Sequence, residues 1–274
     1  MPSRLSLAIL LSSAVAGVGA PTVTDSTTEV LALTSPAPDT GYKVVASADF
    51  EDGTLGSFTN PWGKGIDVVA DPANAGHGKV ARLHYQTFPA GGNFDDNKAL
   101  FPRGLSIGLG NEVLFQGDVY LPSTARMAAS GPAYVLRKLF RFGWDGKSFP
   151  HPLETELVAF GPQFQVYNIY GSHENTTSDY IDPSVANLTA GAWHQVKLQL
   201  KLNSSFAASD GIVRVWVDSI LIFERTSKRW SDPGWTDRPA SYVWNSWGVG
   251  YQANGQQAID EYRYWDNIKF SIKR

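Results

Sequence analysis

The chain has 274 residues, a formal net charge of −3 at pH 7, 18% charged residues and no cysteine. This balance provides no basic surface field, which argues against nucleic acid and against an anionic membrane as the partner. The absence of cysteine excludes a small disulfide-stapled scaffold, whereas a domain of this length can bury enough apolar surface without disulfides.

The N-terminus has the pattern of a secretory signal peptide over residues 1–20. Arg4 precedes an apolar run at residues 5–18, which is too short for a membrane-spanning helix. Residues 21–41 are rich in Ser, Thr and Pro and are expected to form a disordered linker. We therefore expect a secreted monomer with one domain, at residues 42–274.

Three Asn-x-Ser/Thr sequons occur, at Asn175, Asn187 and Asn203, all in segments predicted to be loops. They agree with a secreted glycoprotein. Because chance alone also produces sequons, they support secretion only weakly.

Residues 42–50 are the first predicted strand, and an acidic turn that begins at Glu51 follows it. The last predicted strand, YWDNIKFSI, contains Asp266. If the first and last strands are neighbours, Asp49, Glu51 and Asp266 could supply oxygen ligands to a structural calcium ion. The alternative is a plain turn, with Asp266 as a polar residue on a solvated face.

Residues 79–85 alternate between an apolar face and a polar face that carries Arg82 and His84. The next predicted strands are residues 111–121 and 134–144. In the second of these, strict alternation places Lys138 on the apolar, core-facing side and Arg137, Leu139 and Arg141 on the opposite side.

The segment at residues 153–171 is predicted to hold two strands separated by a Gly-Pro pair. The first strand carries Glu154 and Glu156 on the face opposite to the core. Antiparallel pairing would place Arg141 opposite Glu154, within one or two residues of register. The polar residues that the second strand adds are Gln163, Gln165 and Tyr167. This polar sheet face is suited to binding sugars.

Residues 190–224 contain two more strands, at residues 193–202 and 212–217, with turn residues Asp210-Gly211 between them. The motifs AGAWH, DG and VRVWVD in this segment, with VGYQANG at residues 249–255, resemble the glucuronan lyases of polysaccharide lyase family twenty. More loosely, they resemble the concanavalin-A-like sandwiches. The resemblance implies an all-β, two-sheet antiparallel jelly roll with a concave polar face.

The same resemblance implies a lyase that cleaves an acidic, glucuronan- or alginate-like polysaccharide by β-elimination. This reaction needs a group that neutralises the uronate carboxylate, a base and an acid. The candidate catalytic residues are Arg137, Lys138, Tyr167 and Gln252. Gln252 stands where the family pattern has a tyrosine, so Tyr167 is the substitute candidate for the base. Alternatively, Tyr167 is a half-buried cross-strand tyrosine.

The resemblance also implies a histidine and an arginine close together near the cleft. The candidate substrate-binding residues are Arg82, His84, Arg141, Glu154, Glu156, Gln163, Gln165, Tyr251 and Asn254. For Arg82 and His84, the alternative is an ordinary solvated strand face.

Two other functions are consistent with the sequence. The chain could be a lectin-like module that binds polysaccharide without cleaving it. It could also be a glycoside hydrolase that uses Glu154 and Glu156, whose Cβ atoms would be roughly 6.6 Å apart, near the inverting range. Both glutamates project from one strand, however, and pairing with the arginines is the simpler explanation.

Overall fold

The computed structural model describes residues 40–60, 65–85, 96–97, 100–103, 107–125, 135–143, 154–160, 163–169, 176–180, 188–205, 207–228, 243–244, 246–255 and 260–274. The predicted signal peptide, residues 21–39 of the predicted linker, and the sequons at Asn175 and Asn187 lie outside this set. Regular structure in the described residues consists of strands. Among these residues, there is no helix long and apolar enough to cross a membrane.

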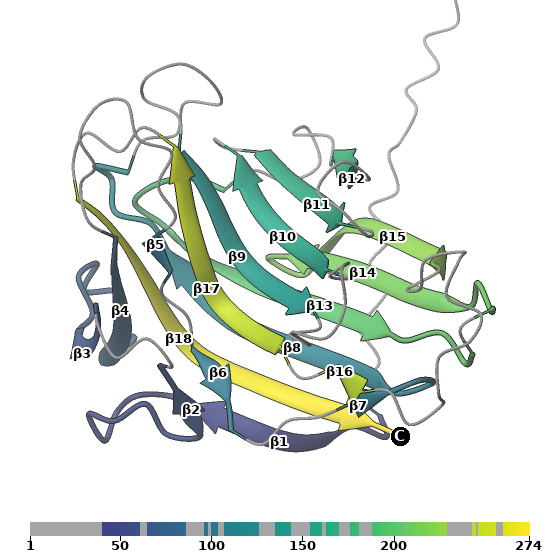
Figure 1. Ribbon diagram of the computed structural model, residues 1–274. Helices are drawn as coiled ribbons and strands as arrows, with labels where there is room; N and C mark the ends of the chain where they lie inside the picture. The colour runs from purple at the N-terminus through teal and green to yellow at the C-terminus, as the bar shows by residue number, and fades with distance from the viewer. Residues whose placement is uncertain are drawn as a thin grey trace, which may run out of the picture. The chain divides into compact units, whose positions relative to one another are not determined.

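The strands form two main antiparallel sheets (Figure 1). The eight-stranded sheet has the order β15-β14-β13-β8-β18-β4-β3, and β1 pairs with the C-terminal half of β18. Its strands are β1 (Lys43–Ala48), β3 (Ile66–Ala70), β4 (Lys79–Tyr85), β8 (Glu112–Tyr120), β13 (Trp193–Lys201), β14 (Gly211–Val217), β15 (Ile220–Lys228) and β18 (Glu261–Lys273). The first and last strands, β1 and β18, are therefore neighbours, which was the condition for the predicted calcium site.

The six-stranded sheet has the order β12-β11-β10-β9-β17-β5. Its strands are β5 (Asp96–Asn97), β9 (Val135–Gly143), β10 (Glu154–Phe160), β11 (Gln163–Ile169), β12 (Thr176–Tyr180) and β17 (Ser246–Gly255). Two short pairs complete the set: β2 (Phe58–Thr59) with β6 (Phe101–Pro102), and β7 (Ile107–Gly108) with β16 (Val243–Trp244).

Aromatic rings from both sheets meet in one core. The ring of Phe115 on β8 lies 5.1 Å from that of Phe140 on β9 and 5.1 Å from that of Phe270 on β18, measured between centroids. All three side chains are fully buried, and burial of such a ring contributes about 1.5–3 kcal/mol. The two sheets thus pack face to face, which confirms the predicted all-β sandwich.

The hairpin of β13 and β14 agrees with its predicted strands. Val196 pairs with Val217, and the carboxylate of Asp210 accepts a hydrogen bond of 2.9 Å from the Ser204 N–H in the connecting loop. Beyond this hairpin, the chain turns into β15, which pairs with β14. Asp218 and Ser219 have φ values of 50° and 69°, and two successive residues with positive φ form the tight turn that closes a hairpin.

The sequon at Asn203 lies in the folded interior. Asn203 has no exposed surface, and its side-chain amide donates a hydrogen bond to the carbonyl oxygen of Ser205. The folded chain therefore does not present this asparagine for glycosylation.

Strict alternation fails in β9. Leu139 and Phe140 are consecutive, yet both are fully buried, whereas alternation predicts only one of them in the core. Leu157 pairs with Phe140 and the next residue, Val158, pairs with Lys138, so Leu139 is an inserted residue. Residues before this bulge consequently occupy different cross-strand rows from those predicted.

Candidate functional site

The backbone register of the six-stranded sheet aligns several predicted site residues in one row. Glu156 pairs with Arg141 on one side and with Tyr167 on the other. Arg141 also pairs with Gly248, so the row crosses β17, β9, β10 and β11. The expected partner of Arg141 was Glu154. It lies two residues from the observed partner, Glu156, which is within the one or two residues of register that the prediction allowed.

A second row lies two residues further along β10. Val158 pairs with Lys138 and with Gln165, and Lys138 pairs with Gln252. Strict alternation placed Arg137 in the polar group and Lys138 toward the core. The bulge changes this assignment, because it aligns Lys138, and not Arg137, with Gln165 and Gln252.

The remaining predicted residues of this sheet lie at its ends and at an irregularity. Gln163 begins β11, and Asn254 pairs with Leu136 near the end of β17. Tyr251 falls where the register of β17 shifts, between Val249 and Gln252. All four candidate catalytic residues therefore belong to one sheet.

Arg82 and His84 do not join this group. They lie on β4, in the other sheet, and the residues that alternate with them are buried in the core. Arg82 donates a hydrogen bond of 2.9 Å to Asp67, and His84 Nε2 lies 2.7 Å from Asp260 Oδ2. Both side chains contact the ring of Tyr262. Their position is the outer face of the eight-stranded sheet, and their part in substrate binding stays a prediction.

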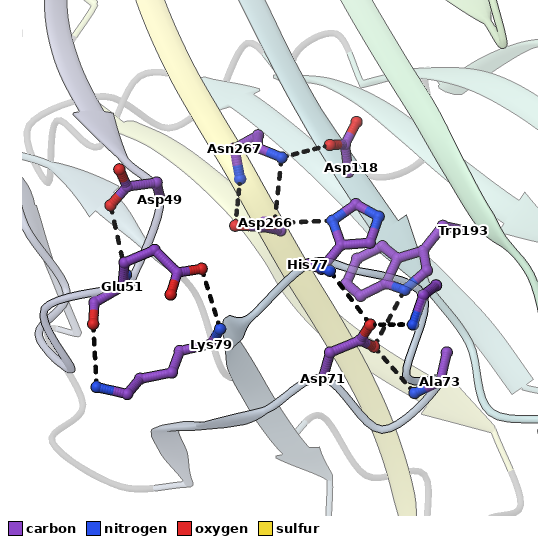
Figure 2. Close-up of polar contacts among 11 residues, drawn as sticks. Asp49, Glu51, Asp71, Ala73, His77, Lys79, Asp118, Trp193, Asp266 and Asn267 are labelled. Carbon is purple, nitrogen blue, oxygen red and sulfur yellow. Dashed lines mark hydrogen bonds and ion pairs between the residues drawn. The ribbon is translucent and has the colours of Figure 1, made fainter.

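Asp266 belongs to a cluster on that same outer face, which we call the histidine–aspartate cluster: His77, Asp118 and Asp266 (Figure 2). The Nδ1 atom of His77 lies 2.8 Å from Oδ2 of Asp266. The side-chain amide of Asn267 donates to Asp118 at 2.8 Å and to Asp266 at 3.1 Å. Burial raises the pKa of Asp266, and the hydrogen bond with His77 acts against this rise.

The other two predicted calcium ligands make different contacts. The main-chain N–H and the ammonium group of Lys79 donate to the carboxylate and the carbonyl of Glu51, at 3.1 and 3.0 Å. Asp49 accepts a bond of 3.4 Å from the Glu51 N–H (Figure 2). In the part of the chain that the structure describes, Asp266 clusters with His77 and Asp118 instead. Calcium binding by Asp49, Glu51 and Asp266 stays a prediction, which a calcium titration can test.

The loop after β3 is organised by Asp71. This carboxylate accepts hydrogen bonds from the N–H groups of Ala73 and Ala75, at 2.9 and 2.6 Å. It also accepts a bond of 3.2 Å from the indole N–H of Trp193, whose ring stacks on His77 with centroids 3.9 Å apart. Asp71 thereby fixes both the loop and the indole that supports His77.

We expect Asp71→Ala to lower the free energy of unfolding by about 2–4 kcal/mol, because several bonds to one charged acceptor are lost together. Urea unfolding of both proteins measures the difference. Asp52→Ala is the control. In the described part of the chain, the carboxylate of Asp52 accepts hydrogen bonds from the main chain and the hydroxyl group of Thr54, both within one exposed turn. Equal effects of the two changes would contradict the role of Asp71.

The carboxylate of Asp71 should also make the stability of the fold depend on pH. Burial raises the pKa of Asp71, but the hydrogen bonds from Ala73, Ala75, His77 and Trp193 together lower it by more. The net result is a pKa below its ordinary value. Its stabilising effect is therefore complete above about pH 4 and is lost as the pH falls through the folded-state pKa. The stability difference between the wild-type chain and Asp71→Asn should shrink in acid.

No known family model matches the sequence, and no curated protein matches it. Among solved structures, the endo-β-1,4-glucuronan lyase from the fungus Trichoderma reesei is similar, with a TM-score of 0.57 and 15% identity over 84% of this chain and 91% of that one. An alginate lyase of polysaccharide lyase family 7 has a TM-score of 0.48 and 12% identity over 76% and 83%. An endo-1,3-β-glucanase from Streptomyces sioyaensis has a TM-score of 0.47 and 14% identity over 86% and 98%. The chain thus has the jelly-roll fold of the glucuronan lyase, as its sequence motifs predict.

Proposed function

We propose that this chain is a secreted, monomeric polysaccharide lyase that cleaves an acidic, glucuronan- or alginate-like polysaccharide by β-elimination. The observation that carries the proposal is the register of the six-stranded sheet. It aligns Lys138 with Gln252 in one row and Arg141 with Tyr167 across Glu156 in the next. The fold likeness to a glucuronan lyase supports it further.

These residue types match the requirements of the reaction. A base removes the proton from C5 of the uronate, the C4–O bond breaks, a C4=C5 double bond forms, and the leaving oxygen takes a proton. Lys138, Arg141 and Gln252 would stabilise the charge that develops on the carboxylate. Tyr167 would act as the base, which requires nearby cations to lower its pKa from about 10.

The reaction class can be tested on purified chain incubated with a panel of uronic-acid polymers. β-Elimination produces an unsaturated end that absorbs ultraviolet light, and we expect it from at least one polymer. The absence of such a product from every polymer, with or without calcium, would contradict the proposal.

Gln252 favours a second candidate, a lectin-like module that binds the polysaccharide without cleaving it. The family pattern has a tyrosine at this position, and glutamine cannot serve as the base. Binding without product in the same panel would identify a lectin. New reducing ends without ultraviolet absorbance would instead indicate hydrolysis through Glu154 and Glu156.

The bulge in β9 predicts which cation matters for function. Lys138→Ala should lower kcat/KM by about tenfold to a hundredfold, because a charge-assisted hydrogen bond to the substrate is worth about 1.5–3 kcal/mol. Arg137→Ala should have a smaller effect, since the register separates it from Gln252. Kinetics on the preferred polymer, with thermal unfolding alongside, measure both. A larger loss for Arg137→Ala would contradict the register argument.

A further inference from the structure

Three potential metal ligands from separate elements meet on the outer face of the eight-stranded sheet. His77 comes from the loop after β3, Asp118 from β8 and Asp266 from β18. One ligand atom of each lies within 4.8 Å of the others. The cluster is sheltered, because the side chains of His77 and Asp266 are only 18% and 4% exposed. It belongs to a different sheet from the proposed catalytic residues.

Strand pairing forces the two carboxylates together. Asp118 and Asp266 are direct cross-strand partners, and Asn267 follows as a bulge residue with φ of 49°. Gly117, opposite the bulge, leaves room for the side chain of Ile268 in the core, since a Cβ there would lie 2.9 Å from it. Like charges directly opposite each other destabilise a sheet, and burial increases the cost. The neutral amide of Asn267 bonds to both carboxylates, and the imidazole of His77 lies 2.8 Å from Asp266, so at most one positive charge faces two negative ones.

The histidine is held in place by its surroundings. Its ring stacks on Trp193 at 3.9 Å with an interplanar angle of 25°. The indole N–H bonds to Asp71, and Asp71 also accepts a bond of 3.4 Å from the His77 N–H. Metal-binding histidines are characteristically oriented by such outer contacts. His77 is therefore preorganised beside the two carboxylates.

We propose that the histidine–aspartate cluster is a divalent transition-metal site, with Zn²⁺ as the ion of best fit, bound by one imidazole nitrogen and two carboxylate oxygens. A nitrogen ligand with two carboxylates suits zinc, whereas calcium takes six to eight oxygens. Bonds of about 2.1 Å in a tetrahedron place ligand atoms roughly 3.4 Å apart. To reach this spacing, side-chain rotation must widen the 2.8 Å separation of His77 Nδ1 and Asp266 Oδ2 and shorten any longer separation, none of which exceeds 4.8 Å. Water, or the oxygen of Asn267 after rotation of its amide, completes the tetrahedron.

Binding of Zn²⁺ alone to the untagged, chelator-stripped chain tests this site independently of any activity. Calorimetric titration should show one equivalent of Zn²⁺ bound. The melting temperature should rise with Zn²⁺ concentration, because the ion binds the folded state. His77→Gln and Asp118→Asn should each weaken the affinity at least tenfold. Asp118→Asn should also leave the melting temperature of the metal-free chain unchanged or higher, since it removes one of two facing charges.

His84→Gln is the matched control. His84 is also a histidine of the outer face, stacked on an aromatic ring at 4.7 Å and 2.7 Å from a carboxylate. The His84→Gln variant should bind Zn²⁺ with the affinity of the wild-type chain. The proposal would be overturned if the wild-type chain bound no stoichiometric Zn²⁺, or if His77→Gln and Asp118→Asn bound it equally well. Tight calcium binding in place of zinc, unaffected by His77→Gln, would also overturn it and favour the oxygen ligands of Asp49, Glu51 and Asp266.

Discussion

Replacement of Phe115 by alanine is expected to lower the free energy of unfolding by about 3–5 kcal/mol. The side chain is fully buried, and its ring contacts the rings of Phe140, Phe270 and Trp265 at centroid distances of 5.1, 5.1 and 6.0 Å. Phe140 belongs to the other sheet, so the cavity would loosen both layers at once. Denaturant unfolding at equilibrium measures the effect.

Gln116→Ala is the control for this prediction. Gln116 is the next residue on β8, lies on the opposite face of the strand and is only partly buried. Its replacement should change stability by about 0.5 kcal/mol or less. If Phe115→Ala cost no more than Gln116→Ala, the two sheets would not depend on this ring.

Tyr167→Phe is expected to reduce kcat by about 10²–10⁴-fold, because it removes the proposed base and leaves the ring. KM should change little, since the substitution keeps the aromatic ring. Steady-state kinetics on the polymer that gives the most product measure both constants. Tyr262→Phe, on the outer face of the other sheet, should leave kcat unchanged. Full activity of Tyr167→Phe would exclude Tyr167 as the base.

The sandwich could be predicted because its signals are local. Alternation with a period of two identified β13 and β14 directly, and the alternating apolar residues of β13 are buried: Val196, Leu198 and Leu200. The position of the bulge at Leu139 could not be predicted, because it depends on how β9 pairs with β10 and β17. The alternation of β9 is broken by Arg137-Lys138 and then Leu139-Phe140, but this break does not show which residue is inserted. One inserted residue was enough to change the roles expected for Arg137 and Lys138.

The candidate sites show the same limit. The residues of β9, β10 and β11 were predicted as a group because these strands are close in the sequence, whereas Gln252 on β17 was added by the family resemblance. Asp266 was expected to meet Asp49 and Glu51 on the condition that the first and last strands are neighbours. His77 and Asp118 were missed. They are brought to Asp266 by the pairing of β8 with β18 and by a loop that Asp71 folds back, and neither carries a recognisable motif.

Mass analysis of the products formed in water labelled with heavy oxygen tests β-elimination most directly. Elimination breaks the C4–O bond without adding water, so the account predicts unsaturated fragments, lighter by one water than the hydrolysis products and free of label when analysed before their reducing ends exchange oxygen with the solvent. Hydrolysis would place one labelled oxygen in each new fragment pair. Labelled, saturated fragments, or intact polymer after prolonged incubation with every uronic-acid substrate, would contradict the assignment of this chain as a lyase.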